Sequence, residues 1–175
     1  MPGLLASPCR IPDCDAMFLI TEQRKYKTHN PHSSLKVMSL IDSNKFQCRV
    51  SSVLNKDVKS YGKKHLFDGN EDSCWNSDQG TPQWIAIEFT DIIKVESYRI
   101  QFQGGFVGTN CVLKITDDCG STHIENFYPE DVNSVQNFSL KEPRLAKSLK
   151  FVFNSSTDFF GRIVVYKLEI IESKR

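Results

Sequence analysis

The stretch from Phe67 to Gly80 gathers residue types that bind calcium, because four carboxylates and two glycines lie close together in a turn-rich run. An EF-hand loop needs oxygen ligands at positions one, three and five, a glycine at position six and a bidentate glutamate at position twelve. Counted from Asp68, the sixth position is Ser73, whose Cβ disfavours a positive φ, and the twelfth is the uncharged Gln79. The EF-hand interpretation therefore fails. We expect a turn built on Asp-Gly, with Trp75 directed into the core.

Other arrangements that would support an enzyme are incomplete. His123 and Glu125 match the start of a zinc deaminase signature, but its Pro-Cys-x-x-Cys is missing, since no cysteine follows Cys119. Cys74 and His65 supply the groups of a thiol–imidazole nucleophile, but a cysteine beside a tryptophan is more often small core packing. The sequence has no Gly-x-Ser-x-Gly elbow and no phosphate-binding loop. We predict that the protein is not an enzyme and uses no cofactor.

Charge and hydropathy narrow the classes of partner. Twenty-two basic and twenty-one acidic side chains give a net charge of +1, whereas nucleic-acid-binding proteins normally carry a basic excess on one surface. The longest apolar run near the start, Ala16–Ile20, is too short to cross a membrane, and Asp13 and Asp15 precede it where a signal peptide carries positive charge. We expect no direct contact with nucleic acid or membrane, and reduced cysteines in an intracellular protein.

The first 37 residues differ from the rest in composition. They hold four of the seven prolines, one of the twelve phenylalanines and neither tryptophan, and they show no sustained apolar period. We predict that residues 1–37 form a flexible N-terminal extension and that residues 38–175 form a single domain. Met38 is an alternative start.

From about Cys48 onward, apolar and polar residues alternate with the period of a β-strand. Gln83–Phe89, for example, places Ile85, Ile87 and Phe89 on one face. No amphipathic helix of three turns is present. Many short strands separated by turns predict an all-β fold, an antiparallel β-sandwich or jelly roll. The further candidate strands are Val95–Gln103, Cys111–Thr116, Val135–Leu140, Leu149–Phe153 and Arg162–Ile171.

Two inter-strand turns carry large apolar side chains, which mark a binding surface when they gather into one exposed patch. The alternative is that these side chains fold back and close the end of the sandwich. For Phe159 and Phe160, which adjoin a strand, we favour this alternative, whereas Phe106 and Val107 leave both interpretations open. The candidate partner-binding residues are Gly104, Gly105, Phe106, Val107, Phe159, Phe160 and Arg162.

Several blocks resemble the discoidin family, also described as coagulation-factor C or galactose-binding-like domains: Val50–Leu54, Leu66–Gly69, Cys74–Ser77, Gln83–Ile87 and Arg162–Ile171. The resemblance spans nearly all of residues 48–171 and implies a jelly roll.

A narrower similarity is to small nuclear discoidin-like proteins that associate with an orphan nuclear receptor. It implies a protein-binding module in the nucleus, and also in the cytoplasm, that represses the receptor by interfering with its binding to a DNA response element. The alternatives are a carbohydrate- or lipid-binding lectin and a docking subunit of a larger intracellular complex. The blocks that carry this similarity are Gly62–Asp68, Cys74–Gly80, Gln101–Phe106, Phe127–Asp131 and Thr157–Arg162.

The resemblance also bears on the turn after Phe67. In sugar-binding discoidin relatives the equivalent turn holds a structural calcium, which implies Asp68, the Asn70 carbonyl and Ser73 as ligands here. Lys167 stands where a glutamate completes that site, although Glu169 lies nearby in the sequence. An ammonium group would repel a cation and pair with Asp68 instead. We therefore expect no metal and a corner fastened by Lys167.

Overall fold

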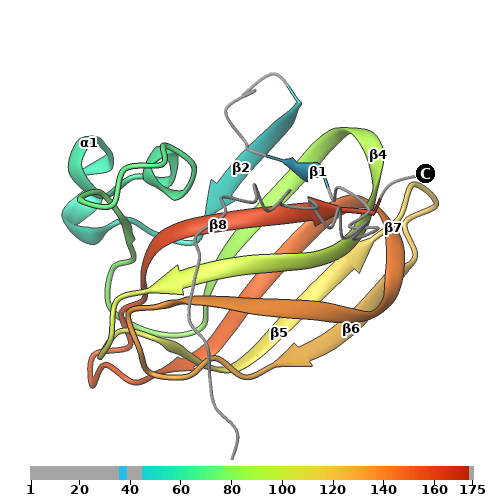
Figure 1. Ribbon diagram of the computed structural model, residues 1–175. Coiled ribbons are helices and arrows are strands. Elements are labelled where there is room, and N and C mark those ends of the chain that lie inside the picture. The colour runs from blue at the N-terminus through green and yellow to red at the C-terminus, as the bar shows by residue number, and fades with distance from the viewer. Residues whose placement is uncertain (1–35, 39–44, 174–175) are drawn as a thin grey trace, which may run out of the picture. The chain divides into compact units, whose positions relative to one another are not determined.

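The computed structural model describes residues 36–38 and 45–173 of the chain. Apart from Lys36 and Val37, the predicted extension lies outside the described residues. The elements are β1 Lys36–Met38, β2 Phe46–Val50, η1 Leu54–Lys56, α1 Val58–Tyr61, η2 Lys63–Leu66, β3 Trp75–Asn76, β4 Gln83–Phe102, β5 Gly108–Thr116, β6 Thr122–Phe127, β7 Val135–Ser156 and β8 Val164–Glu172 (Figure 1).

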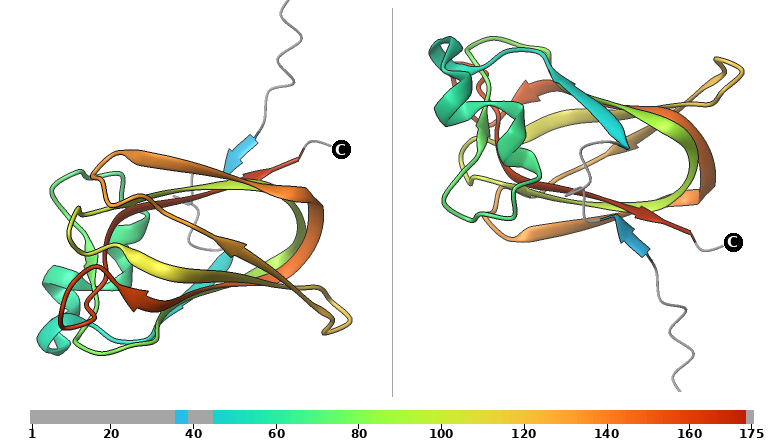
Figure 2. Two further views of the ribbon diagram at one scale, coloured as in Figure 1. Left: turned by 90° about the horizontal axis from the view of Figure 1, so that it is seen from below. Right: turned by 90° about the horizontal axis from the view of Figure 1, so that it is seen from above.

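The strands form a two-layered antiparallel jelly roll, as predicted (Figure 2). One layer contains β2, the first part of β4, the last part of β7, β5 and β6. The other contains β1, β8, the last part of β4 and the first part of β7. β4 and β7 therefore belong to both layers, and Figure 2 shows them curving together from one layer to the other.

The strands differ from the sequence prediction in several ways, and β1, β2 and β3 were not among the candidate strands. β4 and β7 were each expected as two strands, but each is continuous through a bend, with a shift of register between Glu88 and Ile93. β6 was not predicted, because its pattern is reversed: Ile124 is exposed, whereas the polar His123 and Glu125 are partly buried. β1 crosses the predicted boundary between residues 37 and 38 by pairing with β8, and the division into extension and domain stays a prediction.

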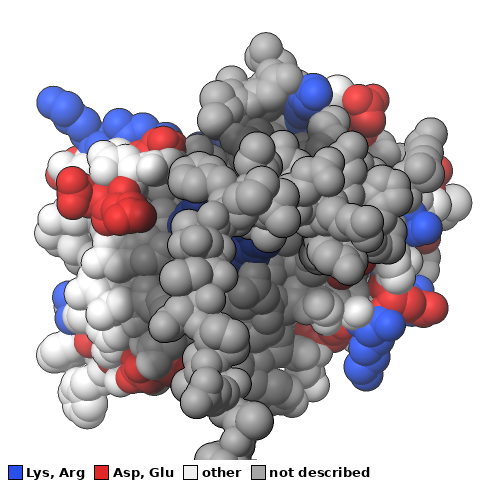
Figure 3. All heavy atoms as spheres, viewed as in Figure 1, with Lys and Arg blue, Asp and Glu red and all other residues white. Residues whose placement is uncertain are grey.

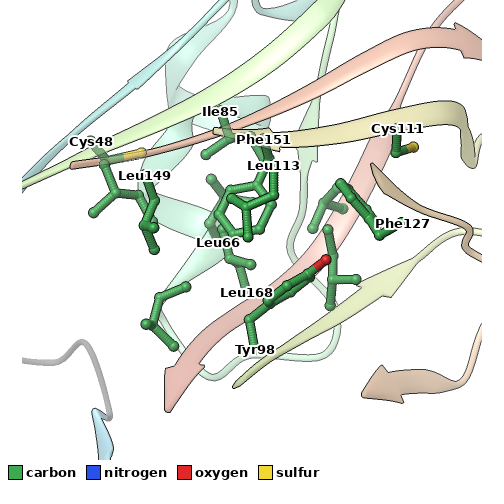
Figure 4. Packing of buried hydrophobic residues seen from close by; sticks show 14 of the residues in the cluster. Cys48, Leu66, Ile85, Tyr98, Cys111, Leu113, Phe127, Leu149, Phe151 and Leu168 are labelled. Carbon is green, nitrogen blue, oxygen red and sulfur yellow. The ribbon is translucent and has the colours of Figure 1, made fainter. Parts of the chain in front are cut away.

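Aliphatic and aromatic side chains together fill the space between the layers (Figure 4). Tyr98 stacks on Phe138 with 5.2 Å between ring centroids and meets Phe127 and Phe151 edge-on at 5.6 and 5.1 Å. Trp75 is fully buried, as predicted, and its indole N–H donates a hydrogen bond to the Ser52 carbonyl. Such aromatic pairs add to the free energy gained by burying apolar area.

The helical segments are short. α1 has four residues and begins after Asp57, whose carboxylate accepts hydrogen bonds from the N–H groups of Lys59 and Ser60. No helix within residues 45–173 has the length and apolar character needed to pass through a bilayer.

The packing around Phe153 gives a test of the core. A Cβ built on Gly108 would lie 2.4 Å from Cδ1 of Phe153, so Gly108→Ala forces this buried ring to move. We expect the substitution to lower the free energy of unfolding by about 1–3 kcal/mol, the usual cost of overpacking. Urea unfolding followed by tryptophan fluorescence measures the change.

Gly104→Ala is the matched control, because its Cβ would meet only Asn133, at an ordinary distance of 3.5 Å. Equal effects of the two substitutions would contradict the tight contact at Gly108.

Candidate functional site

The Asp68 turn is held by hydrogen bonds within the chain. Ser73 Oγ donates to Asp68 Oδ2 at 2.7 Å, and the Asn70 N–H donates to Oδ1 at 3.0 Å. His65 Nδ1 lies 2.9 Å from Asp68 Oδ2, while its Nε2 lies 2.9 Å from the Lys59 carbonyl oxygen. A carboxylate and a carbonyl both accept hydrogen bonds, so the two contacts are made together when the imidazole carries a proton on each nitrogen.

The predicted pairing of Lys167 with Asp68 is wrong. Lys167 Nζ lies 2.9 Å from Glu169 Oε1, because residues two apart on β8 share a face of the strand. Arg99 also contacts Glu169, with 3.6 Å between nitrogen and oxygen. The side-chain nitrogen that contacts Asp68 comes from His65 instead.

These contacts do not fit a calcium site. Both carboxylate oxygens of Asp68 already accept hydrogen bonds from the chain, Oδ1 from the Asn70 N–H and Oδ2 from Ser73 Oγ. Partial burial alone would raise the pKa of Asp68, but the hydrogen bonds from Ser73, Asn70 and His65 together lower it. The carboxylate is thus stabilised in its charged form without an ion.

Neither of the two residue pairs that suggested an enzyme, Cys74 with His65 and His123 with Glu125, has the contacts that catalysis would need. Both ring nitrogens of His65 face Asp68 and Lys59, so neither is directed at Cys74. Burial raises the pKa of Cys74, and a raised pKa keeps a thiol in its less reactive neutral form. His123 Nε2 contacts Glu125 Oε1 at 3.0 Å on β6, and the described chain places no cysteine pair beside them.

Three loops meet at one end of the jelly roll and position the apolar turns. The β4–β5 loop pairs with the β7–β8 loop, since Val107 N–H donates to Thr157 Oγ1 at 3.0 Å and Thr157 N–H donates to the Val107 carbonyl at 2.9 Å. The β6–β7 loop fixes the glycines: Asn133 accepts from the Gly104 N–H at 2.7 Å, and Asp131 accepts from the Gly105 N–H at 2.6 Å. The structure therefore brings the predicted residues of both turns together.

Arg162 joins the aromatic residues of these loops. Its guanidinium donates to both carboxylate oxygens of Asp158, with Nε 3.1 Å from Oδ2 and Nη2 3.2 Å from Oδ1. The same group lies over the Phe106 ring, 4.9 Å from its centroid, and 5.8 Å from that of Phe160. Phe159 meets Phe160 edge-on at 5.3 Å. The stack therefore combines an ion pair with cation–π contacts.

The exposed fractions of the apolar side chains in these two turns differ from what we expected from the sequence. Phe159 and Phe160 do not fold back, because 93% and 54% of their surfaces are exposed, whereas Val107 is fully buried. Ile163, at the end of the same β7–β8 loop, is also fully buried. The backbone of the Phe160 loop is held by a hydrogen bond of 2.8 Å from the Gly80 N–H to the Phe160 carbonyl. Burial removes the Val107 side chain from any direct contact with a partner.

We define the aromatic loop patch as Phe106, Phe159, Phe160 and Arg162. The sequence interpretation missed Asp158, which orients Arg162 and accepts N–H groups of its own loop. The sequence feature that could have identified Asp158 is its position in a turn, four residues before Arg162. Whether the patch binds a partner stays a prediction.

Comparison with known proteins agrees with this geometry. The F5/8 type C domain matches residues 47–164, which is more than half of the chain. The chain belongs to the F5/8 type C family. Within this family it is 55% identical, over 132 residues, to the nuclear receptor 2C2-associated protein of Danio rerio, covering 75% of this chain and 94% of that protein. Its identity to the Homo sapiens protein of the same name is 47% over 127 residues, 72% of this chain and 91% of that protein.

Solved structures share the fold at low identity. The family 32 carbohydrate-binding module of Clostridium perfringens NanJ, solved with galactose, superposes with a TM-score of 0.62 at 18% identity, covering 73% of this chain and 93% of that one. An F5/8 type C domain from Bacteroides fragilis gives a TM-score of 0.66 at 12% identity, with coverages of 82% and 99%. These similarities show the jelly-roll architecture.

The Asp158–Arg162 ion pair makes the loop end sensitive to acid. The hydrogen bond from the Arg162 side chain, against a smaller opposing effect of burial, lowers the pKa of Asp158. A carboxylate with a lowered pKa in the folded state stabilises the fold above its unfolded pKa of about 4, and this contribution is lost as pH falls through the folded pKa. We expect Asp158→Asn to reduce the free energy of unfolding at neutral pH, and the difference from wild type to shrink below about pH 4. Urea unfolding at a series of pH values measures it.

Asp118→Asn, which changes an exposed carboxylate on another loop, is the control. A difference for Asp158→Asn that stays constant across the acid range would show that the ion pair does not stabilise the loop.

The Asp68 turn gives a test with added metal. Asp68→Asn should lower the free energy of unfolding by about 1 kcal/mol, because His65 and Ser73 lose a charged acceptor. Millimolar calcium should leave the thermal midpoint of the wild-type protein unchanged, since a ligand stabilises a protein only by binding its native state. A calcium-dependent rise in the midpoint that Asp68→Asn abolishes would overturn this account.

Proposed function

We propose that the chain is an intracellular protein-binding module that associates with an orphan nuclear receptor and represses its transactivation. It is located in the nucleus, and also in the cytoplasm, and it represses the receptor by interfering with receptor binding to the DNA response element. The names of relatives at 44–55% identity support the receptor as the partner class. The single structural observation that carries the proposal is the aromatic loop patch, with Phe159 almost fully exposed at its tip.

The patch has the composition of a protein-binding surface. Exposed aromatic and arginine side chains contribute most of the free energy in many interfaces. Arg162 is already paired with Asp158 and stacked on Phe106, so a partner can cover it without leaving an unpaired charge. Phe159 is then the residue free to enter an apolar pocket of the receptor.

The positioning of the patch lowers the entropy cost of binding. The Phe160 loop is tied to Gly80, and the Phe106 loop is tied to Thr157, by hydrogen bonds that exist before any partner arrives. A surface that is ordered in the free protein gives up less conformational freedom on association. The rings are therefore presented by a scaffold that need not rearrange.

Charge supports a protein partner rather than DNA as the direct target. The chain has a net charge of +1, and basic and acidic side chains are intermixed on the described surface that Figure 3 shows around α1. Interference with DNA binding then results from covering the DNA-contact or dimer surface of the receptor, not from competition for phosphate groups. Burial raises the pKa of the Cys48 and Cys111 thiols to about 12, so both stay neutral at physiological pH, which supports a binding role without catalysis.

Substitution of the most exposed ring tests the proposal. We expect Phe159→Ser to weaken binding of the full chain to purified nuclear receptor 2C2 at least about tenfold, because loss of an aromatic anchor commonly costs about 2 kcal/mol. Its free energy of unfolding should change by less than about 0.5 kcal/mol, since the ring is exposed. Surface plasmon resonance and urea unfolding provide the two measurements.

Ile124→Ser is the matched control, because Ile124 is also an exposed apolar residue, at 56%, but lies on β6. Full affinity in Phe159→Ser would show that the receptor binds another surface. Retained receptor–DNA complexes in a mobility-shift assay, when the protein is added in excess, would contradict the repression mechanism. A shift of bare response-element DNA by the protein alone would contradict it too.

A further inference from the structure

A row of side chains with three basic members crosses the outer face of the layer that contains β2, β4, β7, β5 and β6. The strand register places Arg49 opposite Ala86, Ala86 opposite Lys150, Lys150 opposite Lys114, and Lys114 opposite Ile124. These residues alternate along their strands with buried neighbours, so their side chains lie on the face away from the core. We call Arg49, Lys150 and Lys114 the basic row.

The positive charge of the basic row is only partly compensated. Lys114 and Lys150 are direct cross-strand neighbours, an arrangement of like charges that destabilises a sheet. The Lys114 side chain forms no hydrogen bond or ion pair within the described residues. The Lys150 ammonium lies 4.5 Å from the centroid of the Trp84 ring, and Arg49 pairs with Glu88 at 3.1 Å. An anion placed over the row would relieve the repulsion between the two lysines.

The basic row lies along an open groove of about 370 Å³. Lys147 adds a fourth basic side chain to the lining, while Glu88 and Asp117 are its acidic members. Lys147 Nζ donates to the Thr90 carbonyl at 2.7 Å, and Asp117 accepts the Ser121 N–H at 2.8 Å. The central part of the groove, between Lys150 and Lys114, therefore has the least compensated charge.

An apolar row runs beside the basic row on the same face. Trp84 is opposite Val152, and Val152 is opposite Val112. All three side chains are partly exposed. The face therefore offers charged and apolar contacts side by side.

We propose that this face of the sheet binds an extended acidic peptide segment of a partner protein. Neighbouring strands lie about 4.8 Å apart, so three strand spacings separate Arg49 from Lys114 by about 14 Å. Carboxylates on alternate residues of an extended chain recur at about 6.7 Å, so acids at positions i, i+2 and i+4 span about 13 Å. Such a segment places one carboxylate near each basic side chain of the row. The intervening side chains point away from the sheet.

The chemistry of the groove favours an acidic peptide over a nucleic acid. Glu88 and Asp117 would repel the continuous phosphate charge of a strand laid along the groove. Single-stranded nucleic acids also gain much of their affinity by stacking bases on aromatic rings. The face of Trp84 is covered by Lys150 and is not free for a base.

Fluorescence anisotropy with the full chain tests this inference. The probe is a fluorescein-labelled peptide of four Glu-Val repeats, and a peptide of four Gln-Val repeats is its uncharged match. We expect saturable binding of the Glu-Val peptide that weakens as salt is added, and at least tenfold weaker binding to the Lys114→Gln, Lys150→Gln variant. Lys56→Gln, Lys59→Gln, which removes two exposed charges near α1, is the matched control and should bind as the wild type does.

A second measurement is independent of the probe. Lys114→Gln alone should raise the urea midpoint at low salt, because it removes one of two repelling charges, and this gain should disappear at high salt. Equal binding of both peptides, no saturable binding of the Glu-Val peptide, or tighter binding of a single-stranded oligodeoxythymidine would each overturn the proposal. The measurement is separate from receptor binding through the aromatic loop patch, because the two surfaces share no residue.

Discussion

The double pairing of β4 with β7 is the constraint on which the rest of the molecule depends. The start of β4 pairs with the end of β7, through Gln83 and Phe153, and the end of β4 pairs with the start of β7, through Gln101 and Val135. Both strands bend between these contacts, so one hydrogen-bonded ladder continues through both layers. The loop after β4 is tied by hydrogen bonds to the loops before and after β7. The aromatic loop patch exists because the ladder brings these loops to one end.

The strand faces could be predicted from the sequence wherever burial alone decides the pattern. Ile85, Ile87 and Phe89 alternate strictly, and all three are buried. β6 escaped prediction because its inward positions His123 and Glu125 contact each other, so a polar pair sits where apolar residues were expected. The bend in β4 was also invisible, since a bent strand and two strands with a turn have the same local pattern.

The orientation of loop side chains could not be predicted, because it depends on which residue fills the end of the core. The sequence offers four large apolar side chains for that position, Phe106, Val107, Phe159 and Phe160, and the structure shows that Val107 is fully buried whereas Phe159 and Phe160 are exposed. The partner of Asp68 was misjudged for a similar reason. Lys167 has Glu169 two residues away on its own strand, whereas His65 reaches Asp68 across one turn. In both of these ion pairs, a contact between residues two or three positions apart formed instead of the long-range pairing of Lys167 with Asp68 that we had expected.

The hydrogen bonds of the Asp68 turn have a consequence for how the domain forms. Every contact that fixes Asp68 comes from residues between Lys59 and Ser73, and no two partners are more than six positions apart. Contacts of such low sequence separation close at small entropic cost and form early relative to long-range strand pairing. The contacts of this corner can therefore begin to form while β4 to β8 are still being synthesised.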